Sequence, residues 1–452
     1  MLDGTNGAHR NRWRRGGLFL SALLVAWSTA ATAAPRFGRP GLFQVDGSPI
    51  AIVALEIDNQ PGLDLTTGNE AGEEGPSLSF LFNRGQGSYL TQKPRVLDVQ
   101  YILHDVATAD FTSDDRDDLA VAVTDASALP LQADILVMRN NGRGGFLSPQ
   151  AFSLTGLLPL KIAAADVTGD GNADVIACHS MQIGAEQQGL ISVLPGKGGG
   201  GFKAPIEFQV DGEMELLTIA HLDNDNRPDL IVADRDTGKI FILYGNNSGS
   251  FFDPPVLLTS VPSPSEIAVV DVDPPSLPDV LVTSYSNGQL YTFRQTANRS
   301  FSPTTPMVIT QLPSDMGAAD FDDDGMTDIV VTSFANATLD LWYGNGVGGF
   351  EFGESVHVAD TPDHLTIANL NDDDRPDVAI SSSLTDTVSV VLQGADVPGS
   401  GDASCDGKFD ASDIDAVIDE IFFQTCKSAD VNFDGRVTAA DLLLIVKLSA
   451  GS

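Results

Sequence analysis

A nine-residue segment rich in aspartate recurs seven times along this chain, and its spacing is the feature that most restricts the fold. The clearest copy runs from Asp320 to Asp328 and leads into an apolar run. The copies begin at Glu56, Asp110, Asp166, His221, Asp271, Asp320 and Asn369, so successive starts are 54, 56, 55, 50, 49 and 49 residues apart. A fixed period of about fifty residues is typical of one supersecondary unit repeated in a stack or a closed ring.

Each repeat contains four short stretches of strand-forming residues. In the copy that begins at Asp320, an apolar strand precedes the acidic segment and a second strand follows it. A third strand runs from Thr338 to Trp342, and a glycine-rich turn with Phe350 opens a looser fourth. Four strands per period, with glycine and aromatic residues between them, are the signature of a propeller blade. We therefore predict an all-β fold, a seven-bladed β-propeller over residues 34–396.

The two ends of the repeat region predict how the ring closes. The last repeat ends after Leu392 without a fourth strand, whereas the stretch from Arg36 to Val45 matches the fourth strand of the other repeats. An N-terminal strand that completes the last blade would leave no exposed edge. The residue before the acidic segment is small in five repeats, which suits the crowded strand nearest a propeller axis: Ala109, Ala165, Ala220, Ala319 and Ala368.

The acidic segments also predict a ligand. Calcium takes six to eight oxygen ligands, and a glycine lets a loop turn sharply around it. Side-chain oxygens fall at positions 1, 3, 5 and 9 of four well-formed copies: Asp110, Thr112, Asp114 and Asp118; Asp166, Thr168, Asp170 and Asp174; Asp320, Asp322, Asp324 and Asp328; and Asn369, Asn371, Asp373 and Asp377. The fourth copy contributes Asp223, Asp225 and Asp229, but His221 at its first position is a poor ligand for a hard cation.

The two remaining copies are weaker candidates. The set Glu56, Asp58, Gln60 and Asp64 would bind calcium weakly, and Pro275 at position 5 predicts that the copy at Asp271 is empty. We expect four to six calcium ions in the propeller. The alternative is that such loops only cap turns with bonds from side chain to backbone.

These residues carry a family resemblance. The pattern D-x-D-x-D-G-x-x-D before an apolar strand, with a Gly-Phe turn before the next unit, resembles the FG-GAP/VCBS repeats of integrin-α-like seven-bladed propellers. The resemblance implies that calcium stiffens each blade and that ligands are held on the opposite face. It implies a scaffold, and says little about what the scaffold holds.

A second pattern begins after a linker at residues 397–401. Two twelve-residue loops with the EF-hand spacing of oxygen ligands each lead into an amphipathic helical pattern: Asp402, Ser404, Asp406 and Asp413, then Asp430, Asn432, Asp434 and Asp441. Residues 402–452 resemble a dockerin, which implies a small α-helical module with two calcium ions and a cohesin-like partner. Ala411-Ser412 and Ala439-Ala440 lack the polar pair that helps choose a cellulosomal cohesin, and Cys405 and Cys426 could form a disulfide.

The N-terminus and the net charge bear on location and partners. Four arginines between Arg10 and Arg15, an apolar stretch from Leu18 to Trp27 and the sequence Ala31-Thr32-Ala33 indicate a signal peptide at residues 1–33. The apolar stretch is too short to anchor the chain, so we expect a secreted, cell-surface or periplasmic protein with no integral membrane segment after cleavage. A formal net charge of −37 argues against a nucleic-acid partner.

The sequence contains no G-x-S-x-G, H-E-x-x-H or phosphate-loop motif. We therefore predict a non-catalytic adhesion or recognition module for a protein or carbohydrate ligand; the alternatives are a polysaccharide lyase or hydrolase, and a propeller that only spaces other components. Three consecutive repeats have long turns between their second and third strands, on the face opposite the acidic loops: Thr66 to Pro76, Thr124 to Ala133 and His179 to Gly189. Long loops on a rigid ring often build a binding site, although insertion drift explains them equally well.

Overall fold

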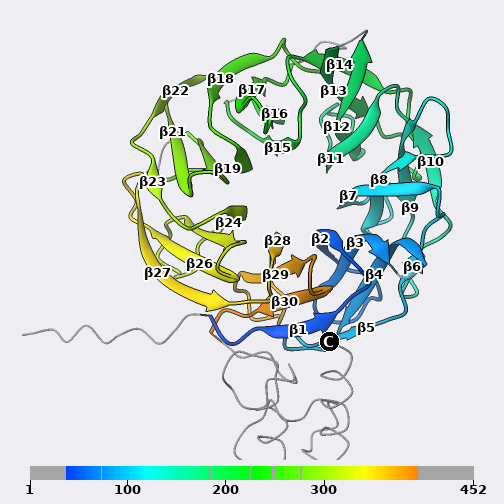
Figure 1. Ribbon diagram of the computed structural model, residues 1–452, viewed down its shortest axis with the longest axis horizontal. Coiled ribbons are helices and arrows are strands. Elements are labelled where there is room, and N and C mark those ends of the chain that lie inside the picture. The colour runs from blue at the N-terminus through cyan, green and yellow to red at the C-terminus, as the bar shows by residue number, and fades with distance from the viewer. Residues whose placement is uncertain are drawn as a thin grey trace, which may run out of the picture. The chain divides into compact units, whose positions relative to one another are not determined.

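The computed structural model describes residues 37–394, apart from residues 73, 184–185, 224, 247–250 and 275–276. These residues form a ring of seven antiparallel sheets and contain no helix (Figure 1). The predicted seven-bladed propeller is confirmed for this part of the chain. The predicted signal peptide, linker and dockerin-like module, with Cys405 and Cys426, lie outside the described residues.

Each blade is one sheet, and in the first six blades successive strands of the chain lie progressively farther from the centre of the ring (Figure 1). The first three blades contain β2 (Pro49–Leu55), β3 (Asp64–Gly72), β4 (Gly75–Asn83), β5 (Tyr89–Thr91) and β6 (Arg95–Val96); β7 (Tyr101–Ala109), β8 (Asp118–Asp125), β9 (Gln132–Met138) and β10 (Gln150–Ser153); and β11 (Leu157–Ala165), β12 (Asp174–Ile183), β13 (Glu186–Leu194) and β14 (Ile206–Val210).

The next three blades follow the same plan. They contain β15 (Leu216–Ala220), β16 (Asp229–Ala233), β17 (Lys239–Leu243) and β18 (Val256–Ser260); β19 (Pro264–Val270), β20 (Asp279–Ser284), β21 (Gln289–Ala297), β22 (Ser300–Pro303) and β23 (Met307–Val308); and β24 (Pro313–Ala319), β25 (Asp328–Ser333), β26 (Thr338–Gly344) and β27 (Phe350–His357).

The seventh blade combines the two ends of the described chain. It contains β28 (Pro362–Ala368), β29 (Asp377–Ser382), β30 (Thr387–Val391) and, as its outer strand, β1 (Gly41–Gln44). The ladder pairs Gly41 with Val390 and Gln44 with Thr387. The edge of the Phe43 ring meets Tyr89 of the first blade at 5.4 Å between centroids. The predicted closure by the N-terminal strand is confirmed.

The apolar core lies between the blades. Each of seven buried clusters draws its residues from two neighbouring sheets. The second strand is the most enclosed, and all the side chains of β16, β20, β25 and β29 are buried. Because both faces of such a strand are covered, its sequence is a continuous apolar run rather than an alternating one. Burial of each large apolar side chain contributes about 1.5–3 kcal/mol, so the ring depends on every blade contacting its neighbours.

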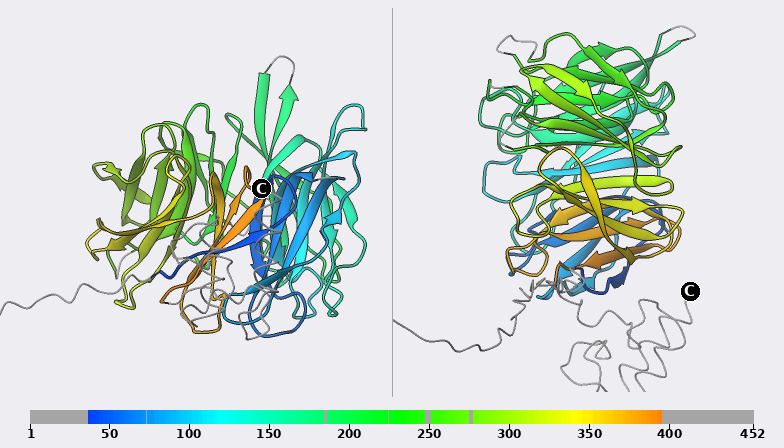
Figure 2. Two further views of the ribbon diagram at one scale, coloured as in Figure 1. Left: turned by 60° about the horizontal axis from the view of Figure 1, so that its bottom comes forward. Right: turned by 90° about the vertical axis from the view of Figure 1, so that its left-hand side faces the viewer.

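The three predicted long turns are mainly hairpin strands. In the first blade the ladder of β3 and β4 extends to the pair Gly72 and Gly75, and in the third blade that of β12 and β13 extends to Ile183 and Glu186. The latter hairpin projects beyond the neighbouring strands (Figure 2). Only the second blade keeps a longer turn, at residues 126–131. The prediction of long loops was wrong in the first and third blades. In these blades, pairing between the two strands satisfies backbone N–H and C=O groups that a loop would leave to water.

The adjacent Cys178 and His179 of β12 are both fully buried, on opposite faces of the strand. Burial raises the pKa of the Cys178 thiol far above its usual range, so the thiol is inert. The His179 ring lies 2.7 Å from the Ser192 hydroxyl (Nε2 to Oγ), and burial lowers its pKa from 6.5 to about 4. Cys178 and His179 therefore form part of the packing between blades.

His179 predicts a component of acid sensitivity. Its folded-state pKa lies below the unfolded value, so the stability that it contributes is present above pH 6.5 and is lost as the pH falls towards about 4. We expect the unfolding free energy of the unmodified chain to drop by about 3 kcal/mol more than that of His179→Gln between pH 7 and pH 4, because each pKa unit is worth about 1.4 kcal/mol. Urea unfolding at the two pH values measures the difference. Parallel losses in the two proteins would contradict it.

Candidate metal-binding loops and the cavity on the opposite face

The seven acidic loops lie at the same end of their blades, between the first and second strands. In the sixth blade, β24 ends at Ala319 and β25 begins at Asp328, so the residues from Asp320 to Thr327 form the loop. Position 6 has a positive φ in five loops: Asp115, Gly171, Asn226, Gly325 and Asp374. Glycine, asparagine and aspartate tolerate this left-handed conformation best, which explains the residue types found there.

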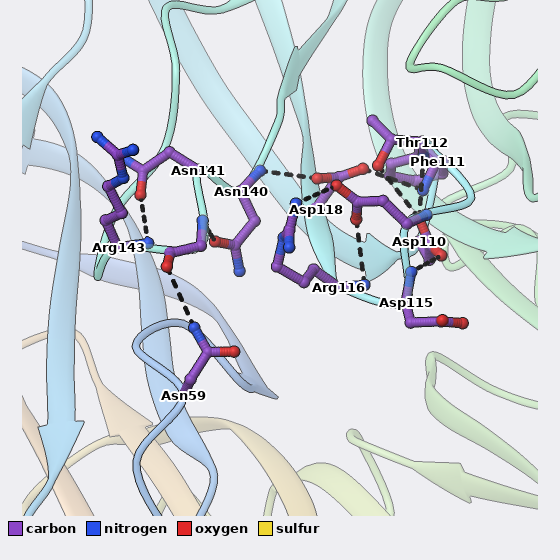
Figure 3. Close-up of polar contacts among 12 residues, drawn as sticks. Asn59, Asp110, Phe111, Thr112, Asp115, Arg116, Asp118, Asn140, Asn141 and Arg143 are labelled. Atoms are coloured by element: carbon purple, nitrogen blue, oxygen red, sulfur yellow. Dashed lines mark hydrogen bonds and ion pairs between the residues drawn. The ribbon is translucent and has the colours of Figure 1, made fainter.

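The aspartate at position 9 has the same surroundings in every blade. Asp118, for example, accepts the N–H of Phe111 at 3.1 Å with one oxygen and that of Asn140 at 2.7 Å with the other (Figure 3). The loop and the end of the third strand are thereby joined. Seven aspartates, at most 1% exposed, accept both bonds at 2.7–3.1 Å: Asp64, Asp118, Asp174, Asp229, Asp279, Asp328 and Asp377.

This structural role differs from the one predicted from the sequence, in which position 9 is only a metal ligand. Burial raises the pKa of Asp118, Asp229 and Asp377 to about 6 and that of Asp64 to about 7, although the N–H donors act in the opposite direction. A carboxylate has about four lone-pair sites, so two N–H contacts leave capacity for a cation. The sequence signal was available, since the ninth aspartate recurs even in the two weak copies.

The residue at position 1 wraps the loop around itself. Asp110 accepts the N–H groups of Thr112, Asp114 and Asp115 at 2.8–3.1 Å. Asp166 accepts those of Gly169, Asp170 and Gly171, and Asp320 those of Asp322, Asp324 and Gly325. Asn369 accepts the N–H of Asp373. These contacts are the turn-capping bonds of the alternative interpretation, and they hold the loops in a compact shape.

Three loops gather carboxylate oxygens from positions 1, 3 and 9 within 4.8 Å of one another: Asp320, Asp322 and Asp328; Glu56, Asp58 and Asp64; and Asp271, Asp273 and Asp279. Such a donor set fits a hard divalent cation. The first cluster is the loop that the sequence ranked highest. The third is the loop predicted to be empty, but Pro275, on which that prediction rested, lies outside the described residues.

Basic side chains reach into four of the loops. Arg116 pairs with Asp114 at 2.5 Å, Lys203 with Asp170 at 3.0 Å and Arg294 with Asp273. In the fourth blade, Arg299 from the next blade binds Asp223 at 2.6 Å and stacks on Tyr244. His221 Nδ1 lies 2.8 Å from the Arg227 carbonyl oxygen. A cation at Asp223 would compete with Arg299, and His221 at position 1 is a poor ligand for a hard cation, so this loop suits a metal least.

The opposite face holds a cavity at the mouth of the central channel. Its volume is about 190 Å³. Its charged lining comes from the inner strands or the residues just before them, with Arg235 from the turn after β16: His104, Asp105, Lys161, Glu215, Glu266 and His364. Lys161 Nζ lies 3.6 Å from Asp105, whose charge raises the pKa of Lys161. Burial and the nearby Asp315 raise the pKa of Glu266.

A second cavity of about 400 Å³ continues from the first. The two share Arg235, Ser265, Ser314 and His364. Tyr285 and Phe334 form the outer wall, with their rings edge-to-face at 6.4 Å between centroids, and Tyr285 is 37% exposed. Neither cavity could be predicted from the sequence, because single residues from several blades line them. We call the two together the channel-mouth site.

Comparison with known proteins agrees with the fold. A family model described as FG-GAP-like repeat matches residues 110–177 and 276–331, which include the loops at Asp110, Asp166 and Asp320. Crystal structures of BBS1N in complex with ARL6DN, one soaked with lead and one with mercury, match with TM-scores of 0.52. The identities are 11% and 10%, and each match covers 80% of this chain and 99% of that one. This likeness concerns the fold alone. No curated protein matches the chain.

Among the described residues, no helix has the length and apolar character needed to cross a membrane.

Proposed function

We propose that this FG-GAP propeller is a secreted or cell-surface recognition module that holds its ligand at the channel-mouth site, on the face opposite the acidic loops. The observation that carries the proposal is the continuity of the two cavities through Arg235, Ser265, Ser314 and His364. Concave sites with a few convergent polar groups are the usual places for ligands. The projecting hairpin of the third blade raises the other side of this face (Figure 2).

The lining favours a carbohydrate over a protein ligand. Tyr285 and Phe334 present aromatic surface at the outer wall, and Arg235, Asp363 and His364 bring charged or polar groups beside them. Rings pack on the apolar faces of a sugar, while such polar groups bind its hydroxyls with directional hydrogen bonds. A flat protein epitope would make less use of a hollow of about 400 Å³.

Calcium has a stabilising role in this proposal. Four to six acidic loops would hold the ion, with the loop at Asp320 as the best candidate because its three carboxylates already converge. The bound ion would link the first and second strands of a blade. Two more ions would order the dockerin-like module at residues 402–452, which would dock onto a cohesin-like domain of a partner or surface scaffold.

A second candidate function is cleavage of a polysaccharide by a lyase or hydrolase mechanism. Glu266 favours it, because burial and Asp315 keep its carboxyl group protonated to a higher pH than usual, as a general acid requires. Asp105 and Asp315 are engaged in structure instead. Each accepts a backbone N–H of the next inner strand at 2.8 Å, from Ile162 and Leu365 respectively.

A glycan panel separates the two functions. The calcium-loaded chain is expected to retain at least one glycan without producing new chain ends. The double change Tyr285→Ala and Phe334→Ala should weaken retention at least about tenfold, because each stacked ring contributes on the order of 1 kcal/mol or more. Phe352→Ala, at a 56% exposed aromatic on the outer strand β27, is the matched control and should bind normally.

Two results would decide against this proposal. Retention that is unchanged in the double variant places the ligand elsewhere. New chain ends that disappear in Glu266→Gln identify an enzyme. A binder should retain its glycan in this variant, because the amide has the same shape as the carboxyl group that it replaces.

A further inference from the structure

A cluster of arginines lies on the acidic-loop face, between the second and third blades. Arg116, Arg139 and Arg143 line a hollow of about 580 Å³ together with Asn141 and Leu147. Arg116 and Arg143 lie on either side of Asn140 (Figure 3). This gathering is unexpected in a chain with 62 acidic and 25 basic residues. One carboxylate, that of Asp114, lines the same hollow, so the lining carries a net positive charge.

Local packing holds two of the three side chains in place. An ideal Cβ on Gly142 would lie 3.3 Å from the Arg116 guanidinium, and one on Gly200 would lie 2.7 Å from Arg139 Cδ. The arginine side chains therefore run along the backbone of these two glycines. Asp114 binds the Nη2 atom of Arg116. The Nε atom of Arg116 is buried and has no hydrogen-bond partner within the described part of the chain. Donors that are fixed before binding lose less entropy when a ligand arrives.

The guanidinium groups of Arg139 and Arg143 are available for a ligand. Arg139 and Arg143 are exposed, and neither forms an ion pair with any residue that the structure describes. A guanidinium group offers a planar set of N–H donors that matches a carboxylate or a sulfate. The hollow therefore suits an oxyanion.

Size and charge narrow the ligand further. A volume of about 580 Å³ exceeds what a bare oxyanion fills and lies within the range of small-molecule pockets. Leu147, 44% exposed, adds an apolar wall. The net charge of −37 repels a densely charged polymer, whereas one local anionic group can still enter a positive hollow. We propose that this hollow binds a monosaccharide-sized ligand that carries one oxyanion, a carboxylate or a sulfate.

Titration calorimetry with the full chain in calcium tests the proposal. The probes are glucuronate, glucose 6-sulfate, glucose and inorganic sulfate. At least one of the two anionic sugars should bind at least tenfold more tightly than glucose and than inorganic sulfate, and its identity distinguishes the carboxylate from the sulfate. In the double variant Arg139→Gln and Arg143→Gln, that affinity should fall at least tenfold. Both side chains are exposed, so the melting temperature should not change.

The matched control removes the same charge elsewhere. Arg227 and Arg375 occupy position 7 of their acidic loops, as Arg116 does in its own, and the double change Arg227→Gln and Arg375→Gln should leave the affinity within twofold. Three outcomes would overturn the proposal: equal affinity for glucose and the anionic sugars, equal affinity for inorganic sulfate, or equal losses in the two double variants. The channel-mouth site lies on the other face, so changes at Tyr285 and Phe334 should not affect this binding.

Discussion

Replacing Asp328 with alanine should destabilise the propeller by about 3 kcal/mol even in chelator, because it leaves two buried N–H groups without an acceptor. Asp328 is fully buried and accepts the N–H groups of Phe321 and Gly344, both at 2.8 Å. Replacing Asp320 in the same loop should cost less than about 1 kcal/mol in chelator, since the N–H groups that it caps in the exposed loop can bind water. Urea unfolding of each variant under the two conditions measures these losses.

Removing calcium should separate the two positions, because only the loss at Asp328 should persist in chelator. A ligand at one hundred times its dissociation constant stabilises the folded state by about 2.7 kcal/mol, and Asp320→Ala should lose this stabilisation at its own loop. Asp323→Asn, an exposed change in the same loop outside the ligand positions, is the control and should behave as the unmodified chain. A loss at Asp328 that vanishes in chelator would show that this residue acts mainly as a metal ligand. Identical unfolding of the unmodified chain in calcium and in chelator would remove calcium from the proposal.

Deleting residues 35–46 should open the ring and have the largest effect on stability. The deletion removes β1, exposes the edge of β30 and takes Phe37, Phe43 and Val45 out of the core. Three buried apolar side chains contribute roughly 5–8 kcal/mol together, and an unpaired edge strand promotes aggregation. We expect a strongly lowered melting temperature and oligomers in size-exclusion chromatography.

Two neighbouring point changes control for the length of the deletion. Phe43→Ala should cost about 3–5 kcal/mol, because Phe43 is buried against the first blade. Gln44→Ala, at the next position of the same strand on its exposed side, should cost less than about 1 kcal/mol. Equal small losses at the two positions, with a monomeric truncated chain, would mean that the ring does not depend on this strand.

Much of the fold could be predicted from local patterns. The period of the acidic loops, the small residue at the end of five inner strands and the missing fourth strand of the last repeat together indicated seven blades and their closure. The long turns between the second and third strands were predicted less well. In these segments a strand differs from a loop only in whether a partner strand forms hydrogen bonds with its backbone. Residues such as Thr66 and His179 proved to lie in strands.

The candidate sites were only partly predictable. The acidic loops and their potential ligands could be named from spacing, and the loop at Asp320 does bring its carboxylates together. The partner of Asp223 could not be named, because Arg299 lies 76 residues away and reaches it only across a blade interface. The channel-mouth site and the hollow at Arg139 could not be predicted either, because both are lined by residues from different blades.

The sequence by itself determined the repeating unit, the number of blades and the positions of the acidic loops, because each depends on residues that are close together along the chain. Only the tertiary structure decided what the ninth aspartate of each loop holds, since its second N–H partner comes from the end of the third strand. It also decided which carboxylates meet arginines and where cavities form. Those features depend on how neighbouring blades pack, and short-range patterns carry no record of that packing.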